Sequence, residues 1–269
     1  MGCCAVNLPL AYAENYIGGN LTISNGQNRE YDNVSISDRD ENTSLYINPN
    51  ASLTVKNDLI IDKDDSRSGI SYGLTANGTE SSVDVAGKTV ISAVNTGDGL
   101  YAVHAGEGAS INLHDTQIFV QSKNNATYGL YAGFLNDGTS GQINIDGTAE
   151  ITVQCDGDGG GNQQAVGIIS AHDSTIKLKD TIITLQGTHK EGSFGIYAFG
   201  GTTGTNLINV EGNCKIAFQD IRNEATFATT TAIKAYGTTG NNDNTIRITG
   251  DTEITGNYDT VSVSMPVLM

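Results

Sequence analysis

Residues 129–132 read Gly-Leu-Tyr-Ala, and residues 143–151 read Ile-Asn-Ile-Asp-Gly-Thr-Ala-Glu-Ile. Apolar side chains at alternate positions predict short, half-buried β-strands, since successive side chains of a strand point to opposite faces. Gly147 predicts a turn that divides the second stretch into two strands. The whole unit therefore contains three short strands.

This three-strand unit recurs along the chain, and internal repeats determine an architecture before local propensities do. The first strand opens at steps of 26, 30, 38, 28 and 37 residues, at Gly73, Gly99, Gly129, Gly167, Gly195 and Ala232. The second strand carries the apolar pairs Val83/Val85, Ile111/Leu113, Ile143/Ile145, Ile176/Leu178, Ile208/Val210 and Ile246/Ile248. The third strand begins at Ile91, Ile118, Ile151, Ile183, Ile216 and Ile254.

A turn residue precedes each third strand, and its identity correlates with the length of the turn. The third strand begins four residues after a glycine and three after an aspartate, at Gly87, Asp115, Gly147, Asp180, Gly212 and Gly250. Glycine tolerates a positive φ, whereas aspartate closes a tight turn through its own carboxylate. We therefore expect Gly147 to adopt a positive φ.

Each strand buries only two or three residues, so the units must stack to form a core, about 4.8 Å apart. The repeat does not match a propeller or a leucine-rich repeat. We predict an all-β, right-handed, single-stranded parallel β-helix with three short strands per coil and about seven to eight coils. One core should contain the ladders Leu100-Leu130-Ile168-Ile196 and Ile111-Ile143-Ile176-Ile208.

The repeat also suggests how the chain is divided. Residues 1–13 end in Ala11-Tyr12-Ala13 and are expected to be the remnant of a signal peptide. Gly2 and Cys3 offer two alternatives, an acylation site or the end of a lipoprotein box. Residues 14–70 are predicted to form N-terminal capping coils, residues 71–263 the β-helix repeats, and residues 264–269 a truncated end.

The net charge of the chain limits the classes of molecule that it could bind. A net charge of −16 and a pI near 4.4 argue against nucleic acid and anionic membranes, which need clustered Lys and Arg. Of the four cysteines, Cys3 and Cys4 lie at the N-terminus, and no metal-binding spacing is present. Cys155 and Cys214 are not expected to form a disulfide.

Histidines and aspartates in the sequence could suggest metal binding, but each set also has an interpretation without a ligand. His104 and His172 each follow a repeat glycine by five residues, with Phe134 at the equivalent position between them. They would stand about 9–10 Å apart, too far to share a metal, so we expect solvated loop histidines. Calcium is conceivable at Asp156–Asn162 and at Asp62, Asp64 and Asp65, although a flexible insertion loop is the alternative. We predict no catalytic residue, metal or cofactor.

The third position of the first strand should face outward, and it holds Tyr101, Tyr131, Ile169 and Tyr197. Tyrosine combines a rigid apolar face with a polar tip, so these residues form a candidate ligand-contact stripe. The alternative is that the ladder only stabilises the sheet.

The Ala-Tyr-Ala end, the repeated Gly-Leu-Tyr-Ala strand and the Ile-x-Ile/Val-x-Gly-x-x-x-Ile pattern of residues 143–151 and 246–254 resemble bacterial autotransporter passenger domains. The resemblance covers residues 14–263. It implies export and adhesin-like display at the outer membrane through a C-terminal β-barrel. Such a barrel is lacking in this sequence, so a membrane anchor is implied only by the resemblance.

We therefore expect a secreted or bacterial cell-surface, non-enzymatic module with an adhesion or spacer role. Its partner would be a protein or glycan on a host or neighbouring cell. The alternative is a β-helical carbohydrate-active enzyme of the polysaccharide lyase or hydrolase type, with a site in the loops at 154–166 or 219–231. A third possibility is a stalk that binds nothing.

Overall fold

The computed structural model describes residues 14–39, 41–65, 69–97, 99–123, 125–133, 139–156, 164–189, 192–200, 204–223, 230–237, 242–256 and 262–264. These residues form 25 strands and no helix. The composition explains this, because Gly, Asn, Thr and Asp favour turns and strands over helices. The all-β prediction is confirmed.

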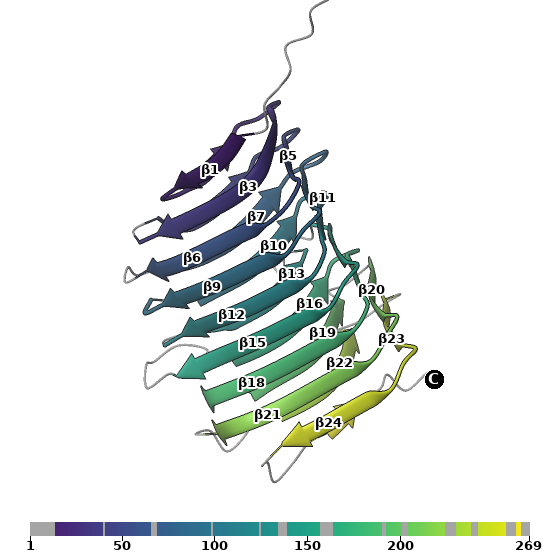
Figure 1. Ribbon diagram of the computed structural model, residues 1–269. Helices are drawn as coiled ribbons and strands as arrows, with labels where there is room; N and C mark the ends of the chain where they lie inside the picture. The colour runs from purple at the N-terminus through teal and green to yellow at the C-terminus, as the bar shows by residue number, and fades with distance from the viewer. Residues whose placement is uncertain are drawn as a thin grey trace, which may run out of the picture.

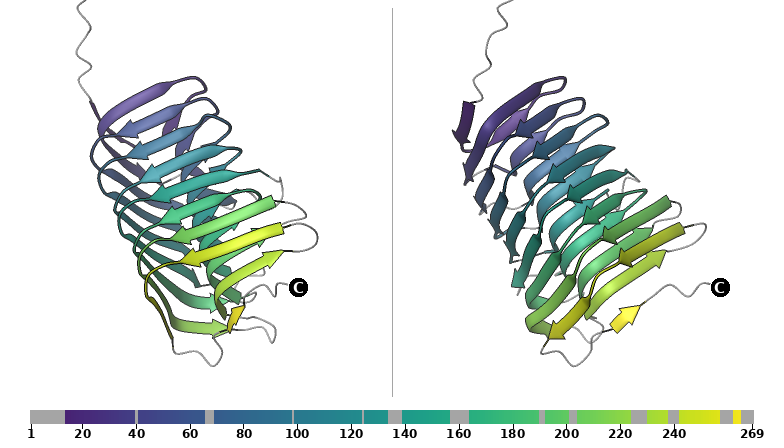
Figure 2. Two further views of the ribbon diagram at one scale, coloured as in Figure 1. Left: turned by 90° about the vertical axis from the view of Figure 1, so that its right-hand side faces the viewer. Right: turned by 45° about the vertical axis from the view of Figure 1, so that its right-hand side comes forward.

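All strand pairings are parallel, and the strands form three faces that wind around one core (Figures 1 and 2). The first face consists of β5 (Ser52–Val55), β8 (Ser82–Val85), β11 (Ala109–Leu113), β14 (Gly141–Ile145), β17 (Thr175–Leu178), β20 (Gly204–Val210) and β23 (Asn242–Ile248). The second consists of β6 (Leu59–Asp65), β9 (Thr89–Asn95), β12 (Thr116–Ser122), β15 (Ala149–Asp156), β18 (Thr181–His189), β21 (Cys214–Asn223) and β24 (Thr252–Gly256). The third is a nine-stranded sheet of β2 (Leu21–Ile23), β4 (Thr43–Ile47), β7 (Ile70–Asn77), β10 (Gly99–Gly106), β13 (Thr127–Ala132), β16 (Gln164–Ala171), β19 (Gly192–Gly200), β22 (Thr230–Gly237) and β25 (Ser262–Ser264).

The long strand β3 (Asn28–Asp38) joins the first two faces, because its beginning pairs with β5 and its end with β6. In Figure 1 the strands of the second face run from right to left across the near side while the chain descends from its N-terminal end. This sense of winding is right-handed. The first coil is β2–β3, and seven three-strand coils follow from β4 to β24, so the predicted parallel β-helix is confirmed.

The core ladders of the first two faces agree with the predicted register. Ile111, Ile143, Ile176 and Ile208 pair in sequence, and each is at most 1% exposed. The third-strand isoleucines pair in the same way from Ile91 to Ile254. Period-two alternation fixed these registers, because a slip of one residue would turn every apolar side chain to the outside.

The predicted ladder through Leu100 is wrong. Leu100 pairs with Ser71 and Thr127, and Val103 occupies the position next to Leu130. The ladder is therefore Val103-Leu130-Ile168-Ile196. The residue directly before each member of this ladder is small, as Gly129 is before Leu130. A Cβ at Gly129 would lie 2.5 Å from the Gly167 carbonyl oxygen and from Ile151 Cγ2. In β10 that position holds Ala102, not Gly99.

The conformation predicted for Gly147 is also wrong, because its φ is not positive. A Cβ at Gly147 would instead overlap the carboxylate of Asp115 on the preceding coil. The same Asp115 oxygen accepts a hydrogen bond from the amide of Thr148 at 2.9 Å, and Asp180 repeats this arrangement with Asn213. Glycine is needed here for close approach between coils rather than for an unusual φ.

Within residues 14–70, the strands β2 to β6 continue the same faces as the later coils. The strand β1 (Glu14–Gly18) pairs with β3 at the N-terminal end of the stack (Figure 2). The expected signal-peptide remnant, residues 1–13, lies outside the described residues. So does the expected truncated end, apart from Ser264.

Candidate functional site

The outer face of the nine-stranded sheet carries two ladders of side chains that lie three residues apart. The pairing omits one small residue in each strand without a shift of register, which is Gly129 in β13 and Ala102 in β10. Tyr128 and Tyr131, three residues apart, both point outward, whereas Leu130 points into the core. We call the resulting group the aromatic layer. It consists of Tyr72, Tyr101, His104, Tyr128, Tyr131, Val166, Ile169, Phe194 and Tyr197.

The predicted contact stripe belongs to the aromatic layer, but it does not form one exposed row. Tyr131, Ile169 and Tyr197 share a ladder, whereas Tyr101 lies on the adjacent ladder beside Tyr128. Tyr131 and Ile169 are each 1% exposed, and Tyr101 is 9% exposed. The expectation of an exposed stripe is therefore wrong for these three residues, which offer almost no surface to a ligand.

Ring stacking explains part of this burial. The Tyr101 ring lies 5.0 Å from that of Tyr72 and 4.6 Å from that of Tyr128, with near-parallel planes. Burial raises the pKa of the Tyr101 and Tyr197 hydroxyls above the usual value. Tyr197 is half-buried, and the Lys234 ammonium lies 5.4 Å from the centre of its ring. Pointing away from the main core thus does not mean exposure to water.

His104 is part of the aromatic layer and is buried, so the prediction of a solvated histidine is wrong here. Its Nδ1 lies 2.9 Å from the Thr75 hydroxyl, and its Nε2 lies 3.2 Å from the Gly133 carbonyl oxygen. A carbonyl can only accept, so Nε2 carries the proton and the Thr75 hydroxyl donates to Nδ1. Burial lowers the pKa of His104 to about 4, and the imidazole is neutral near pH 7. His172 is half-buried with a φ of 49°, and Phe134 lies outside the described residues.

The calcium hypothesis for Asp62, Asp64 and Asp65 is contradicted by the geometry of β6. Asp62 and Asp64 point outward, whereas Asp65 points into the core and is 1% exposed. Asp62 also forms an ion pair with Arg39 at 2.5 Å. The three carboxylates therefore do not converge, and the described part of the chain contains no cluster of metal ligands. Of the candidate calcium site at Asp156–Asn162, Asp156 is described, while Asp158 and Asn162 lie outside the described residues.

The two described cysteines are free and buried, so the expectation that they form no bridge is confirmed. Both point into the core, from β15 and β21 respectively. Burial raises the pKa of the Cys155 thiol to about 12 and that of Cys214 to about 11. Neither is suited to nucleophilic chemistry, which needs the thiolate.

A row of amide side chains on the second face is a feature that our reading of the sequence missed. Gln121, Gln154, Gln186 and Gln219 pair in register on four successive coils. Each follows a third-strand isoleucine by three residues, so the spacing could have revealed them. Gln186 donates to the Oε1 of Gln219 at 2.9 Å, and Gln121 donates to Asp156 at 2.8 Å. We call these four residues the amide row.

A shallow surface cleft lies along the amide row. It is lined by Gln154, Asp156, Gln186, Gly187, Thr188 and Asp220. The pairing of β18 with β21 is irregular between Gln186 and Thr188, and Gly187 has a φ of 101°. Asp220, on the opposite strand, has a φ of 51°, which is uncommon for a residue other than glycine. The irregularity opens the surface beside two carboxyl groups and two amides.

Comparison of the chain with family models, with curated proteins and with solved structures found no match. Within the described part of the chain, no helix is long and apolar enough to cross a membrane.

Proposed function

We propose that this chain is a secreted or bacterial surface-displayed module without enzymatic activity, and that it acts in adhesion or as a spacer. The amide row is the observation that carries the adhesion role. Its four side chains repeat at the strand spacing of about 4.8 Å along the axis of the coil. The motifs that resemble autotransporter passengers support display at the cell surface.

A neutral glycan is the partner that suits this surface best. Each amide offers both a donor and an acceptor to sugar hydroxyls. A net charge of −16 repels nucleic acid and acidic polymers, so hydrogen bonds to uncharged groups are the available attraction. The parallel ladders, which continue from β3 to β24, give the module the rigidity that a spacer needs.

The adhesion role can be tested by binding of the purified chain to glycan arrays and to cells. We expect the triple variant Gln154→Ala, Gln186→Ala, Gln219→Ala to bind roughly tenfold or more weakly, from the loss of several hydrogen bonds. Gln142→Ala is the matched control, since Gln142 is an exposed amide on the first face. Equal binding by native and triple-variant chains would exclude the amide row. No binding by the native chain would leave only the spacer role.

A carbohydrate-active enzyme is the second candidate, because the cleft holds the two carboxyl groups of Asp156 and Asp220. Paired carboxyl groups serve as acid and base in glycoside cleavage. Incubation of the chain with acidic and neutral polysaccharides, with and without calcium, would reveal released oligosaccharides. Loss of that release in Asp220→Asn, with an intact fold, would favour the enzyme over the adhesion module.

A further inference from the structure

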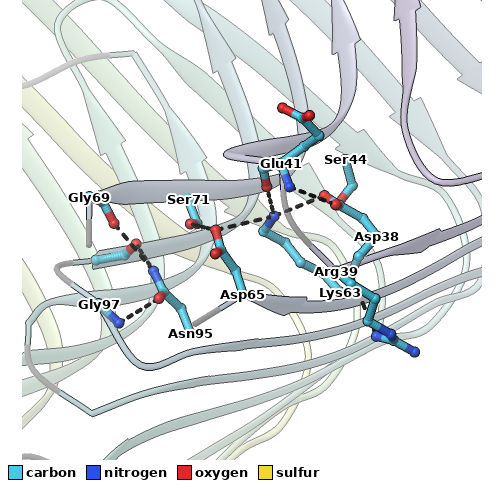
Figure 3. A network of polar contacts seen from close by, with 11 residues as sticks. Asp38, Arg39, Glu41, Ser44, Lys63, Asp65, Gly69, Ser71, Asn95 and Gly97 are labelled. Carbon is cyan, nitrogen blue, oxygen red and sulfur yellow. Dashed lines mark hydrogen bonds and ion pairs between the residues drawn. The ribbon is translucent and has the colours of Figure 1, made fainter. Parts of the chain in front are cut away.

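The interior of the first coils contains a buried ion pair with a second carboxyl group beside it (Figure 3). The Lys63 Nζ lies 2.9 Å from Asp38 Oδ2 and 3.7 Å from Asp65 Oδ2. All three side chains are at most 2% exposed. A charged group so deep in an apolar core loses its hydration, which makes this arrangement costly as an ion pair.

Strand pairing brings the three residues together. Asp38 and Lys63 are directly paired on β3 and β6, and Asp65 follows Lys63 by two residues on the same side of β6. In the next coil, Ala93 pairs with Lys63. Its small side chain leaves room for the long lysine inside the coil. The ammonium also donates to the carbonyl oxygen of Glu41.

Hydrogen-bond donors surround the carboxyl group of Asp38. The Glu41 amide donates to Oδ1 at 2.9 Å, and the Ser44 hydroxyl donates to Oδ2 at 2.8 Å. Donors in these positions would also stabilise the negative charge that develops on the oxygens during attack at the carboxyl carbon. Burial would raise the pKa of Asp38, but these donors and Lys63 outweigh it and hold the pKa below its usual value. The resting pair is thus an ammonium and a carboxylate.

We propose that Lys63 and Asp38 condense to an intramolecular isopeptide bond, with the carboxyl group of Asp65 relaying the proton. Lys63 transfers one proton to the Asp38 carboxylate across their 2.9 Å contact, and the free amine attacks the carbon of the resulting carboxylic acid. Asp65 accepts a proton from the attacking nitrogen and passes it to the hydroxyl group of the tetrahedral intermediate, which leaves as water. An ammonium and a carboxylate become one amide and one water, so no further reactant is needed, and Asp65 returns to its starting state.

Two physical factors favour this step. The reacting groups are already held in contact by paired strands, so little entropy is lost on the way to the transition state. The amide product removes two opposite charges from a buried site and keeps hydrogen-bonding groups for the same neighbours. The bond would fasten the first coil covalently to the second. This inference does not depend on the proposed function.

The test is a peptide map of the purified, folded full chain after denaturation and digestion with trypsin. We expect peptide 30–39 joined to peptide 57–67, lighter than their sum by one water, with no cleavage at Lys63. The exposed ion pair of Lys56 with Glu30, at 2.5 Å, is an internal control. It lies in water, so cleavage after Lys56 should be normal.

Recovery of peptide 30–39 unlinked from the native chain, together with peptides 57–63 and 64–67 from cleavage at Lys63, would overturn the proposal, whatever the variants do. Lys63→Arg should abolish the branched peptide. Asp65→Asn should reduce its yield at least tenfold, although Lys63 and Asp38 are both retained. A full yield of branched peptide in Asp65→Asn would overturn the relay role of Asp65.

Discussion

The ring of Tyr101 stacks on that of Tyr128, with centroids 4.6 Å apart and an angle of 14° between the planes. The repeated Gly-Leu-Tyr-Ala motif aligns Tyr101 with Tyr131 instead, whose ring lies 5.3 Å away. Both tyrosines of β13 reach the Tyr101 ring because the strict alternation is interrupted at Gly129 and Leu130, so that residues 128 and 131 lie on the same side. The outer surface of this sheet is therefore a second hydrophobic cluster, distinct from the main core.

The aromatic layer should contribute strongly to stability. We expect Tyr131→Ala to lower the free energy of unfolding by about 3–5 kcal/mol, the usual cost of removing a large buried aromatic side chain. Tyr236→Ala is the control, because Tyr236 extends the same face but is 44% exposed. It should cost under about 1 kcal/mol. Urea unfolding of both variants provides the measurement, and similar losses would contradict the burial of Tyr131.

A pair of substitutions can test whether glycine is needed at position 147 because of its close approach to Asp115. A Cβ at Gly147 would overlap the Asp115 carboxylate, so Gly147→Ala should lose about 1–3 kcal/mol of stability. In the background of Asp115→Gly the same change should cost less, because the carboxylate contacts are gone and only the Asp115 backbone nitrogen, at 2.9 Å, stays close to the Cβ. Gly19→Ala is the control, since only one atom lies within 4 Å of a Cβ there, at 3.9 Å. A double-mutant cycle without coupling would indicate that the clash is not the cause.

Stability should fall in mild acid because of His104. Its pKa is about 4 in the folded chain and near 6.5 when unfolded, so the unfolded state binds more protons between these values. As pH falls from about 6.5 to about 4, up to about 3 kcal/mol of stability should be lost through this group. Below pH 4 its contribution should change no further.

Replacement by glutamine isolates this effect, because the amide can donate to Gly133 and accept from Thr75 without titrating. His104→Gln should therefore lose less stability than the native chain between pH 7 and pH 4.5, measured by urea unfolding at each pH. In His114→Gln the native loss should persist, because His114 is exposed and its pKa is raised by Asp146. Identical pH profiles for His104→Gln and the native chain would show that His104 is not buried in the neutral form.

Cys155 and Cys214 should be inert in the folded protein. Their thiols are buried and their pKa values are raised, so little thiolate is present near pH 8. In a chain with Cys3→Ser and Cys4→Ser, we expect no alkylation by iodoacetamide over hours, followed by rapid labelling of two thiols in urea. Labelling of either cysteine under native conditions, detected by mass spectrometry, would contradict the inward placement.

The sequence by itself determined the coil architecture and most of the core. The alternating isoleucines of the second and third strands allow only one register, since a slip of one residue would turn them into water. The separation of Cys155 from Cys214 by about two coils argued against a disulfide between them, and both are free. The amide row was also readable, because each glutamine stands three residues after a core isoleucine.

The tertiary structure decided what depends on neighbouring coils. The register at Leu100 was mispredicted because loops of different length separate the copies of the motif, and because Ala102, not a glycine, precedes the ladder residue Val103 in β10. Alternation shows on which side of a strand a tyrosine lies, but only the packing between coils shows whether that side is exposed to solvent. Asp38 and Lys63 meet inside the molecule because strands β3 and β6 are adjacent, a contact between residues that no local pattern connects.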